Sequence, residues 1–441
     1  MSAHAPRSGR LARGAIAGTA AVQLGMATLA RKAQVLTLSD AAAAQARAAH
    51  EAKLGRILFG ALNQLKGIAL KASQLLSLEL GLLPEGMRSE LARAHYQGTP
   101  LNRALVIKLM RQEFGAAPED LFACFEPQAF AAASLGQVHA ATLHSGEAVA
   151  VKLQYPGMAA SMGSDMALLR GLLRGLAMGS DALPRAEVMG RVMADIELKL
   201  AEELDYQHEA EQLLWFGLQL ASLPNLVVPR PVAERSSRRV LTMTRLQGLH
   251  LNEWLTTGPS QTERNRYGQM IFDLFLHCVF VLGRLQADPH PGNSLFMPQG
   301  RLGLLDFGCT QLLSPAFCAA LSAAWNALLR QPCDHTALQQ AYLALGLISP
   351  ELGAHHFRDE LLPALRPFLA WQIQPFTKAV FDFGQLPPPP RTRADHQRSA
   401  VGHLQAMSPD LPYFDRSYLG LLQTLRTLGA RVRTTNPWIH A

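Results

Sequence analysis

Two acids and an amide lie close together in residues 285–308, which read LQADPHPGNSLFMPQGRLGLLDFG. Asn293 follows Asp288 by five residues, and Asp306 opens the tripeptide DFG. Carboxylate and amide oxygens, with water and phosphate, are the ligands that Mg²⁺ prefers. The two prolines after Asp288 predict a tight loop, and GLLD predicts a short buried strand that ends at the last acid. The segment therefore predicts a magnesium site with Asn293 and Asp306 as its protein ligands.

A lysine upstream has the context of a phosphate-binding residue. Lys152 closes the apolar run VAVK on a predicted strand, where lysine is rare unless an anionic group meets it. In kinase-type folds such a strand carries the lysine that holds the α- and β-phosphates, and the catalytic loop keeps the Asp-to-Asn spacing seen here. That pattern predicts that Asp288 lies near the attacking hydroxyl. A strand-end lysine that reaches water is the simpler alternative for Lys152 taken alone.

A phosphate-binding lysine needs an acid to orient it, and the predicted helical segment AEELDYQHEAEQ offers several. On one continuous helix, Glu202, Asp205 and Glu209 would share a face. Acidic helix faces are usually solvated. Next to a strand lysine, however, at least one carboxylate is expected to point inward. We expect Glu209 to pair with Lys152, with Glu203 as the alternative.

The elements that must position these residues follow from the hydrophobic periodicity. Residues 35–110 are predicted to be helical. The runs QVHAATL and AVAVKLQ around a glycine turn predict a β-hairpin, and AFAAASL before them is either a third strand or a loop. Further predicted elements are a long helix at 186–221, a strand pair at 225–232 and 238–246, and a mostly helical region from 252 onward.

Composition sets broad limits on the function. The 441 residues are 49% hydrophobic, which indicates a folded globular protein of two lobes with appendages. The formal charge of +7 favours anionic surfaces but names no partner. The five cysteines show no C-x-x-C spacing, which indicates a reducing compartment and no structural zinc.

One stretch resembles a membrane segment: residues 14–30, GAIAGTAAVQLGMATLA. The run is short, rich in Ala and Gly, and interrupted by Gln23, whereas a spanning helix needs roughly 20 apolar residues. The alternatives are an interfacial helix and a plain helix packed on the body of the protein. No other stretch of the sequence is expected to span a bilayer.

The chain resembles the ABC1/UbiB/ADCK (AarF) family of atypical kinases over about residues 55–330. The matching segments, in order, are AAASLGQVHAA, VAVKLQYPG, EELDYQHEAE, ADPHPGN and LLDFG. The resemblance implies an α+β, protein-kinase-like two-lobe fold with a mostly helical C-lobe. It also implies a helical N-terminal extension over the active site. The extension's K-x-G-Q motif matches Lys71-Ala72-Ser73-Gln74, and the family's E-x-D motif matches Glu203-Leu204-Asp205.

The resemblance implies a site for ATP (or ADP) and Mg²⁺. An alanine-rich loop replaces the glycine-rich loop of protein kinases, and Lys71 and Gln74 would reach towards the E-x-D acids and the nucleotide. The implied catalytic residues are Asp288, Lys152 and Glu209. The implied nucleotide-binding residues are Ala131, Ala132, Ala133, Ser134, Gly136, Gln137, Lys152, Lys71, Gln74, Glu203 and Asp205.

The expected organisation combines the periodicity with the resemblance. The predicted segments are an N-terminal arm at 1–50, a helical extension covering the active site at 51–112, a β-rich N-lobe with the acidic helix at 113–247, a C-lobe with the catalytic and DFG loops at 248–385, and a proline-rich spacer with a basic tail at 386–441. Whether the tail binds lipid, binds a partner or packs on the C-lobe is left open by the sequence.

Members of this family are implicated in ubiquinone biosynthesis and lipid homeostasis, often at membranes, and act as ATPases or small-molecule kinases. The resemblance therefore implies a nucleotide, anionic lipid, and quinone-biosynthesis enzymes or quinone precursors as partners. No nucleic acid is expected. The implied location is cytoplasmic, peripheral to the inner membrane if the source is bacterial.

Four residues depart from the family pattern. Ser73 stands where the family has Gly, and Gln286 where members usually have His. Gln212 replaces a common Asn, and Thr244 replaces a frequent Glu. None of these positions is an expected phosphate or magnesium ligand. The departures weaken the inference of a ubiquinone role more than the inference of the fold.

Two alternatives stay open. A small-molecule phosphotransferase of the aminoglycoside/choline-kinase type also carries a D-x-H-x-x-N loop, but the alanine-rich loop and the K-x-x-Q extension argue against it. A nucleotide-binding scaffold without catalysis is the other. A protein kinase is disfavoured because the sequence has neither a G-x-G-x-x-G loop nor an A-P-E motif after DFG.

Overall fold

The computed structural model describes residues 10–35, 40–65, 67–78, 83, 85–91, 101–133, 135–177, 186–390 and 408–440. The chain divides into two compact units. Unit 1 is Met1–Leu214 with Arg230–Arg245, and unit 2 is Trp215–Pro229 with Leu246–Ala441. Each unit is described by itself.

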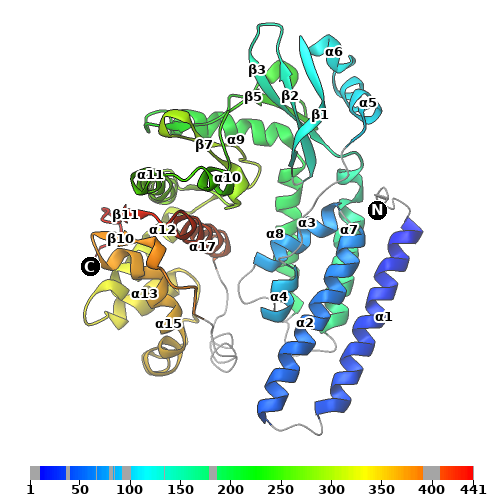
Figure 1. The fold of residues 1–441 in the computed structure, drawn as a ribbon. Coiled ribbons are helices and arrows are strands. Elements are labelled where there is room, and N and C mark those ends of the chain that lie inside the picture. Colours follow the sequence, from blue (N-terminus) through cyan, green and yellow to red (C-terminus); the bar gives the residue numbers. More distant parts are fainter. Residues whose placement is uncertain are drawn as a thin grey trace. The chain divides into compact units, whose positions relative to one another are not determined.

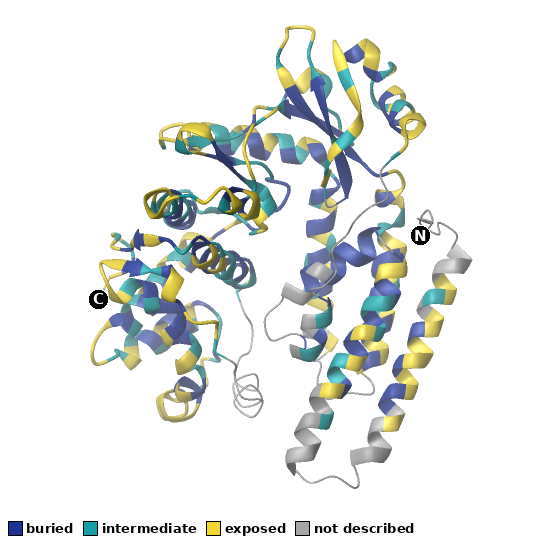
Figure 2. Cartoon of the chain, viewed as in Figure 1, coloured by how far each residue is buried: buried dark blue, intermediate teal, exposed yellow. Residues whose placement is uncertain are grey.

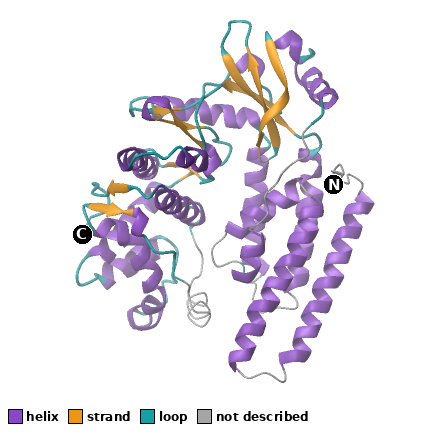
Figure 3. Ribbon diagram, in the orientation of Figure 1, coloured by secondary structure: helices purple, strands orange, loops and turns teal. Residues whose placement is uncertain are grey.

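Unit 1 combines a helical bundle with a sheet (Figures 1 and 3). Its helices are α1 (Arg10–Val35), α2 (Asp40–Leu65), α3 (Gly67–Leu78), α4 (Glu85–Leu91), α5 (Arg103–Phe114), α6 (Pro118–Leu121), α7 (Met158–Ala177), α8 (Ala186–Glu203) and the first part of α9 (Tyr206–Gln219). Along α2, Leu54, Leu58 and Leu62 recur every four residues and are fully buried. Gly55 lets α2 approach α4, since a Cβ there would lie 2.8 Å from the Cα of Met87.

The segment at 14–30 belongs to α1, which packs on α2 and α7. Ala20, Leu24 and Ala27 are buried in the bundle core, whereas Val22 and Met26 are each 62% exposed. The segment is therefore a helix with one face packed in the bundle of unit 1, and the interfacial helix stays a prediction. Among the described residues, no helix has both the length and the apolar character needed to cross a bilayer.

The sheet of unit 1 is antiparallel, in the order β1-β2-β3-β5. Its strands are β1 (Cys124–Ala133), β2 (Gly136–Thr142), β3 (Ala148–Gln154) and β5 (Val240–Thr244). The predicted hairpin is confirmed as β2–β3, and most of AFAAASL lies in a third strand, β1, rather than in a loop. Lys152 is on the inner strand β3, opposite Val138 on one side and Leu241 on the other. The strand is buried from Val149 onward, which fits the apolar residues that precede Lys152.

The strand pair predicted at 225–232 and 238–246 is wrong in its main pairing. β4 (Leu226–Val227) pairs in parallel with β8 (Arg301–Leu304), both in unit 2, while β5 pairs with β3. Between the two predicted strands the structure forms a single bridge, from Pro231 to Met243. Two prolines, Pro229 and Pro231, interrupt the first segment, and a proline has no N–H to continue a ladder.

The single helix predicted at 186–221 is also wrong, because α8 ends at Glu203 and α9 starts at Tyr206. Asp205 Oδ1 accepts hydrogen bonds from the backbone N–H groups of Gln207 (3.1 Å) and His208 (3.4 Å). A short acidic side chain of this kind starts a new helix rather than continuing an old one. Glu202 and Glu209 therefore lie on different helices and share no face.

Unit 2 is mostly helical, with three small sheets. After the end of α9, its main helices are α10 (Leu251–Thr256), α11 (Gln261–Phe280), α12 (Pro315–Leu329), α13 (His335–Ala344), α14 (Ala354–His356), α15 (Leu362–Ile373) and α17 (Leu411–Leu428). Its strands are β4, β6 (Arg284–Gln286), β7 (Ser294–Met297), β8 (Arg301–Leu304), β9 (Thr310–Leu312), β10 (Val380–Asp382) and β11 (Arg431–Arg433). The pairings β4-β8-β7 and β6-β9 frame the catalytic and DFG segments.

The described part of the C-terminal region, 408–440, packs in unit 2 (Figure 2). Tyr418, Leu422 and Leu425 of α17 are buried at helical spacing. β11 pairs with β10, so the division predicted at 386 separates two strands that are hydrogen-bonded to each other. This part of the tail is thus a component of the unit 2 core.

Candidate functional site

The predicted phosphate-binding lysine is held by a carboxylate inside unit 1. Lys152 Nζ lies 2.8 Å from each carboxylate oxygen of Glu209, which is on α9. Lys152 is 7% exposed and Glu209 1% exposed. The Tyr206 ring lies 5.0 Å from the same ammonium group. Glu209, rather than the alternative Glu203, is therefore the partner of Lys152. A buried, two-oxygen pairing fixes the lysine in a single position.

A second buried pair joins the helical extension to α8. Lys71 Nζ on α3 lies 3.0 Å from Glu203 Oε1, and both side chains are less than a tenth exposed. The resemblance implied that Lys71 reaches this acid. Gln74 is also on α3, but its side chain lies outside the described residues.

Asp205 has a different environment from Glu203. Besides capping α9, it forms an ion pair with Arg238, whose Nε lies 3.3 Å from Oδ2. Glu202 is paired with Lys199 at 3.0 Å. Four of the five acids of the segment thus have three kinds of role: Glu203 and Glu209 meet buried lysines of other elements, whereas Asp205 caps a helix and Glu202 forms a pair within α8.

The alanine-rich segment is a tight antiparallel hairpin. Ala131, Ala132 and Ala133 are the last residues of β1, and Ala133 pairs with Gly136 across the turn. Ser134 lies outside the described residues. Gly136 is required by packing, because a Cβ there would lie 2.2 Å from the carbonyl oxygen of Leu153.

Gln137 is buried among protein groups rather than exposed at the hairpin. Its Oε1 accepts a hydrogen bond from the backbone N–H of Leu101 (2.6 Å), and its Nε2 lies 2.6 Å from His139 Nε2. His139 Nδ1 faces the carbonyl oxygen of Glu126 at 2.8 Å, so Nδ1 donates and Nε2 accepts from Gln137. Burial lowers the pKa of His139, against a smaller opposing effect of the Glu126 carbonyl. The neutral imidazole fits this chain of hydrogen bonds.

In unit 2, the catalytic and DFG segments are linked by backbone and side-chain hydrogen bonds. Asn293 Nδ2 donates to the carbonyl oxygen of Asp288 (3.0 Å), and the N–H of Leu305 donates to the carbonyl of Asn293 (2.9 Å). Asp306 Oδ1 accepts from the N–H of Gly308 (2.8 Å). The side-chain nitrogen of Asn293 faces Asp288. The side-chain oxygen of Asn293, Oδ1, therefore points away from that contact. An amide oxygen is a suitable ligand for a hard cation.

The chemistry of this donor set fits Mg²⁺. Among the described residues, no group of three or more His, Cys, Asp and Glu side chains could hold a metal ion by itself. Mg²⁺ is often bound by one or two carboxylates while water and phosphate complete its shell. Asp306 and Asn293 would hold the ion, which would supply positive charge to phosphate oxygens.

Gln286, which departs from the family pattern, links the two segments directly. Its Nε2 donates to the backbone carbonyl oxygen of Asp306 (2.7 Å), and the backbone carbonyl oxygen of Gln286 accepts from Ser417 Oγ (3.3 Å). An amide N–H can therefore make the bond that an imidazole N–H would make. Phe307 of the DFG tripeptide stacks on Phe216, with ring centroids 4.4 Å apart.

Two further departures, Ser73 and Thr244, are accommodated as well. Ser73 is fully buried, and its hydroxyl donates to the carbonyl of Leu70 at 2.7 Å, so the extra oxygen is paired within α3. Thr244 Oγ1 accepts from the N–H of Arg230 at 2.9 Å.

Sequence reasoning missed the role of α17 in supporting the catalytic loop. Ser417 contacts Gln286, and Gly420 allows a close approach, since a Cβ there would lie 2.2 Å from Pro289 Cβ. Asp410 accepts hydrogen bonds from Gln311 and from the N–H of Ser314. The helical spacing of the large apolar residues between 411 and 428 was the available signal.

Comparisons with known proteins agree with this geometry. The model of the ABC1 atypical kinase-like domain matches residues 95–341, more than half of the chain. "Atypical kinase COQ8, mitochondrial" of Saccharomyces cerevisiae is 33% identical over 257 residues, which is 58% of this chain and 50% of that protein. "AarF domain-containing protein kinase 1" of Mus musculus is 29% identical over 364 residues, or 81% and 66% of the two chains.

A solved structure shows the same fold. "The complex structure of Rv3197-erythromycin from Mycobacterium tuberculosis" superposes with a TM-score of 0.61 at 25% identity, covering 85% of this chain and 92% of that one. The chain spans about half the length of the first curated relatives it matches. The α+β fold is protein-kinase-like, and the chain belongs to the ABC1 atypical kinase-like family.

Proposed function

We propose that this protein is an ATP- and Mg²⁺-dependent atypical kinase-like ATPase that supports ubiquinone biosynthesis or lipid homeostasis at a membrane surface. The observation that carries the proposal is the buried pair between Lys152 and Glu209. A lysine on an inner strand, fixed by both oxygens of one carboxylate, has the arrangement that kinase-type folds use for nucleotide phosphates.

The roles of the residues follow from their surroundings. Lys152 would hold the α- and β-phosphates, oriented by Glu209. Asn293 and Asp306 would bind Mg²⁺, and Asp288 would assist a phosphate acceptor or a water molecule. The hydrogen bonds between the segments of Asn293 and Asp306 support this assignment because they keep both metal ligands on fixed backbones.

The extension and the hairpin would complete the nucleotide site. Lys71 and Glu203 form a buried pair in unit 1, as the resemblance leads one to expect, and with Gln74 and Asp205 they would approach the nucleotide. Ala131, Ala132, Ala133, Ser134 and Gly136 would contribute the backbone of the hairpin. Gln137 would act indirectly, because its amide is engaged by Leu101 and His139.

The membrane and quinone parts of the proposal rest on the family and on charge. Members of the family are implicated in ubiquinone and lipid metabolism, and the formal charge of +7 favours anionic surfaces. The partners would then be anionic lipid and quinone-biosynthesis enzymes or precursors, at the cytoplasmic face of the inner membrane if the source is bacterial.

The test compares the wild-type chain with Asp306→Asn. Nucleotide binding and Mg²⁺-dependent ATP hydrolysis are measured with and without anionic liposomes and a phenolic quinone-precursor mimic. Asp382→Asn, an acid of unit 2 outside the two segments, is the matched control.

Hydrolysis lost in Asp306→Asn and kept in the control supports the enzyme. Equal binding and equal hydrolysis in wild type and Asp306→Asn, including none in either, contradict it. Binding and rates unchanged by liposomes contradict the membrane role.

A further inference from the structure

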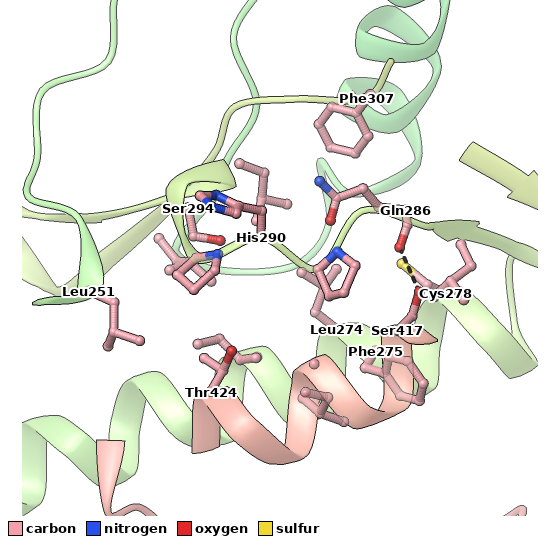
Figure 4. A pocket seen from close by; sticks show the side chains of 18 of the residues that line it. Leu251, Leu274, Phe275, Cys278, Gln286, His290, Ser294, Phe307, Ser417 and Thr424 are labelled. Atoms are coloured by element: carbon pink, nitrogen blue, oxygen red, sulfur yellow. Dashed lines mark hydrogen bonds between the residues drawn. The ribbon is translucent and has the colours of Figure 1, made fainter. Parts of the chain in front are cut away.

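Unit 2 contains a cavity of about 120 Å³ beneath the catalytic loop (Figure 4). Its walls come from α11, α17, the β7–β8 hairpin, the catalytic loop and Phe307, and they are mainly apolar, with Leu274, Phe275 and Leu421 as examples. Protein interiors are packed like organic crystals, so a space of this volume is unusual. An engineered apolar cavity of about 150 Å³ stays dry and binds benzene. The volume here therefore suits a single ring or a short branched chain.

The cavity has its entrance at the catalytic loop. Of the residues that line it, His290 and Pro291 are exposed, whereas its deeper walls, such as Leu302 and Phe307, are almost completely buried. A molecule would therefore enter past the loop that carries Asp288 and Asn293.

The polar atoms in the walls define the chemistry of an occupant. Ser417 Oγ already donates to the backbone carbonyl oxygen of Gln286, and Gln286 Nε2 donates to the backbone carbonyl oxygen of Asp306. The hydroxyls of Ser294 and Thr424 make no hydrogen bond within the part of the chain that the structure describes. Among the residues that the structure describes, no Asp, Glu, Lys or Arg lines the cavity. Because burying an unpaired charge is costly, the occupant must be neutral, with an apolar body and at most a small polar group.

The position of the cavity separates it from the phosphate chemistry. Asp288, Asn293 and Asp306 do not line it. A molecule bound here would touch the backs of the loops that carry these residues and would not meet the groups assigned to metal and acceptor. The cavity therefore suits an effector rather than a phosphate acceptor.

We propose that this cavity is an effector site for a small neutral molecule with a ring-sized apolar body, and that its occupancy stabilises the catalytic and DFG loops. The claim that occupancy stabilises the two loops rests on the proposed function, whereas the claim that a molecule binds in the cavity does not. Pro289, Gln286 and Phe307 are all wall residues, so an occupant packs directly against both loops. Filling the space adds contacts to the arrangement in which Phe307 stacks on Phe216 and Gln286 holds Asp306.

Binding is tested on the full chain by ¹⁹F NMR with fluorobenzene and 4-fluorobenzyl alcohol. Saturable binding is expected for wild type, and Leu274→Phe is expected to abolish it by filling the space. Leu312→Phe makes the same substitution at an exposed position of unit 2 and is expected to leave binding unchanged. Thr424→Val is expected to weaken binding of the alcohol and to spare fluorobenzene.

Two outcomes would overturn the binding inference. One is the absence of saturable binding of either compound to wild type. The other is equal binding to wild type and to a folded Leu274→Phe. Should Leu274→Phe fail to fold, a second filling variant, Cys278→Met on the buried side of the cavity, makes the same comparison.

Coupling is tested by measuring MgADP affinity with and without saturating fluorobenzene. We expect an increase of about fivefold in wild type, at the lower end of typical coupling between two sites, and none in Leu274→Phe. Fluorobenzene binding without a change in MgADP affinity refutes the effector role. A wild-type chain that binds fluorobenzene but no nucleotide refutes the proposed function, while the cavity remains a binding site.

Discussion

Two buried lysine–glutamate pairs in unit 1 have almost the same local chemistry. Lys152–Glu209 and Lys71–Glu203 both have N–O distances of 3.0 Å or less, and all four residues are less than a tenth exposed. If distance and burial alone determined the role of an ion pair, the two pairs would therefore have the same role.

The elements that carry the two pairs differ. Lys152 is on an inner strand, contacts both oxygens of Glu209 and faces the ring of Tyr206. Lys71 is on a helix of the extension and ties it to the end of α8. We therefore expect the strand lysine to act mainly on a phosphate, and the pair between two packed helices to act mainly by holding those helices together. The supporting element, rather than the ion pair, indicates the role.

The largest expected effect follows from breaking the first pair. Lys152→Met should reduce ATP hydrolysis by about 100-fold or more, because a fixed cation at the phosphates is lost. It should also lower the free energy of unfolding by about 3–5 kcal/mol, since the buried carboxylate of Glu209 loses its lysine. Hydrolysis assays and denaturant unfolding measure the two effects.

The double variant Lys152→Met/Glu209→Leu separates these effects. It should regain most of the stability but none of the activity, because no unpaired charge remains. Recovery of hydrolysis in the double variant would show that Lys152 does not act on the nucleotide.

Breaking the second pair should affect stability more than hydrolysis. Lys71→Met leaves Glu203 buried without its lysine, and a loss of up to about 3 kcal/mol is expected, the low end for buried pairs, because the contact involves a single carboxylate oxygen. Hydrolysis should fall much less than in Lys152→Met. If a folded Lys71→Met is as inactive as Lys152→Met, the contrast between the pairs fails and Lys71 acts on the nucleotide as directly as Lys152 does.

A smaller effect is expected from the link between the loops of unit 2. Gln286→Leu removes the donor to the Asp306 carbonyl, a bond worth about 1 kcal/mol, so the Mg²⁺ concentration for half-maximal hydrolysis should rise about fivefold. Gln286→His restores a ring N–H and should recover most of this loss. An unchanged Mg²⁺ requirement in Gln286→Leu would show that this link does not position the metal ligand.

The smallest effect is the pH response, which we assign to His139 rather than to the two lysine pairs. Burial lowers the pKa of His139 in the folded chain below its usual 6.5, so the unfolded chain takes up a proton first as the pH falls. Stability should therefore be complete above pH 6.5 and decline as the pH falls below that value. Thermal unfolding between pH 8 and 5 should show this decline in wild type but not in His139→Gln.

The matched control for the pH response is His144→Gln, since His144 is exposed. This variant should keep the wild-type pH dependence. A decline that persists in His139→Gln would assign the pH response to other groups.

The sequence was sufficient for the family, the fold class and the β2–β3 hairpin, because these depend on short local patterns. The break at Asp205 was missed, since helical periodicity continues across it and a single capping side chain ends it. Pairing β4 with β8 was also missed, because residues far apart in the chain decide strand partners.

The roles of two site residues and of the C-terminal tail depended on neighbours that no motif contains. Gln286 seemed anomalous until its contact with the Asp306 carbonyl was seen. Gln137 matched a nucleotide-binding position, yet its amide is engaged within unit 1. The tail seemed separate because a proline-rich stretch precedes it, although α17 packs beneath the catalytic loop.

The sequence by itself determined which chemical groups are present and in what order: Lys152, the acids of the α8–α9 region, Asp288, Asn293 and Asp306. Only the tertiary structure decided that Glu209 rather than Glu203 meets Lys152, and that α17 and the loops leave an apolar cavity between them. The physical reason is the separation along the chain over which each kind of interaction acts. Motifs and periodicity act over a few residues, whereas ion pairs and cavities are set by packing between elements that are distant in the chain.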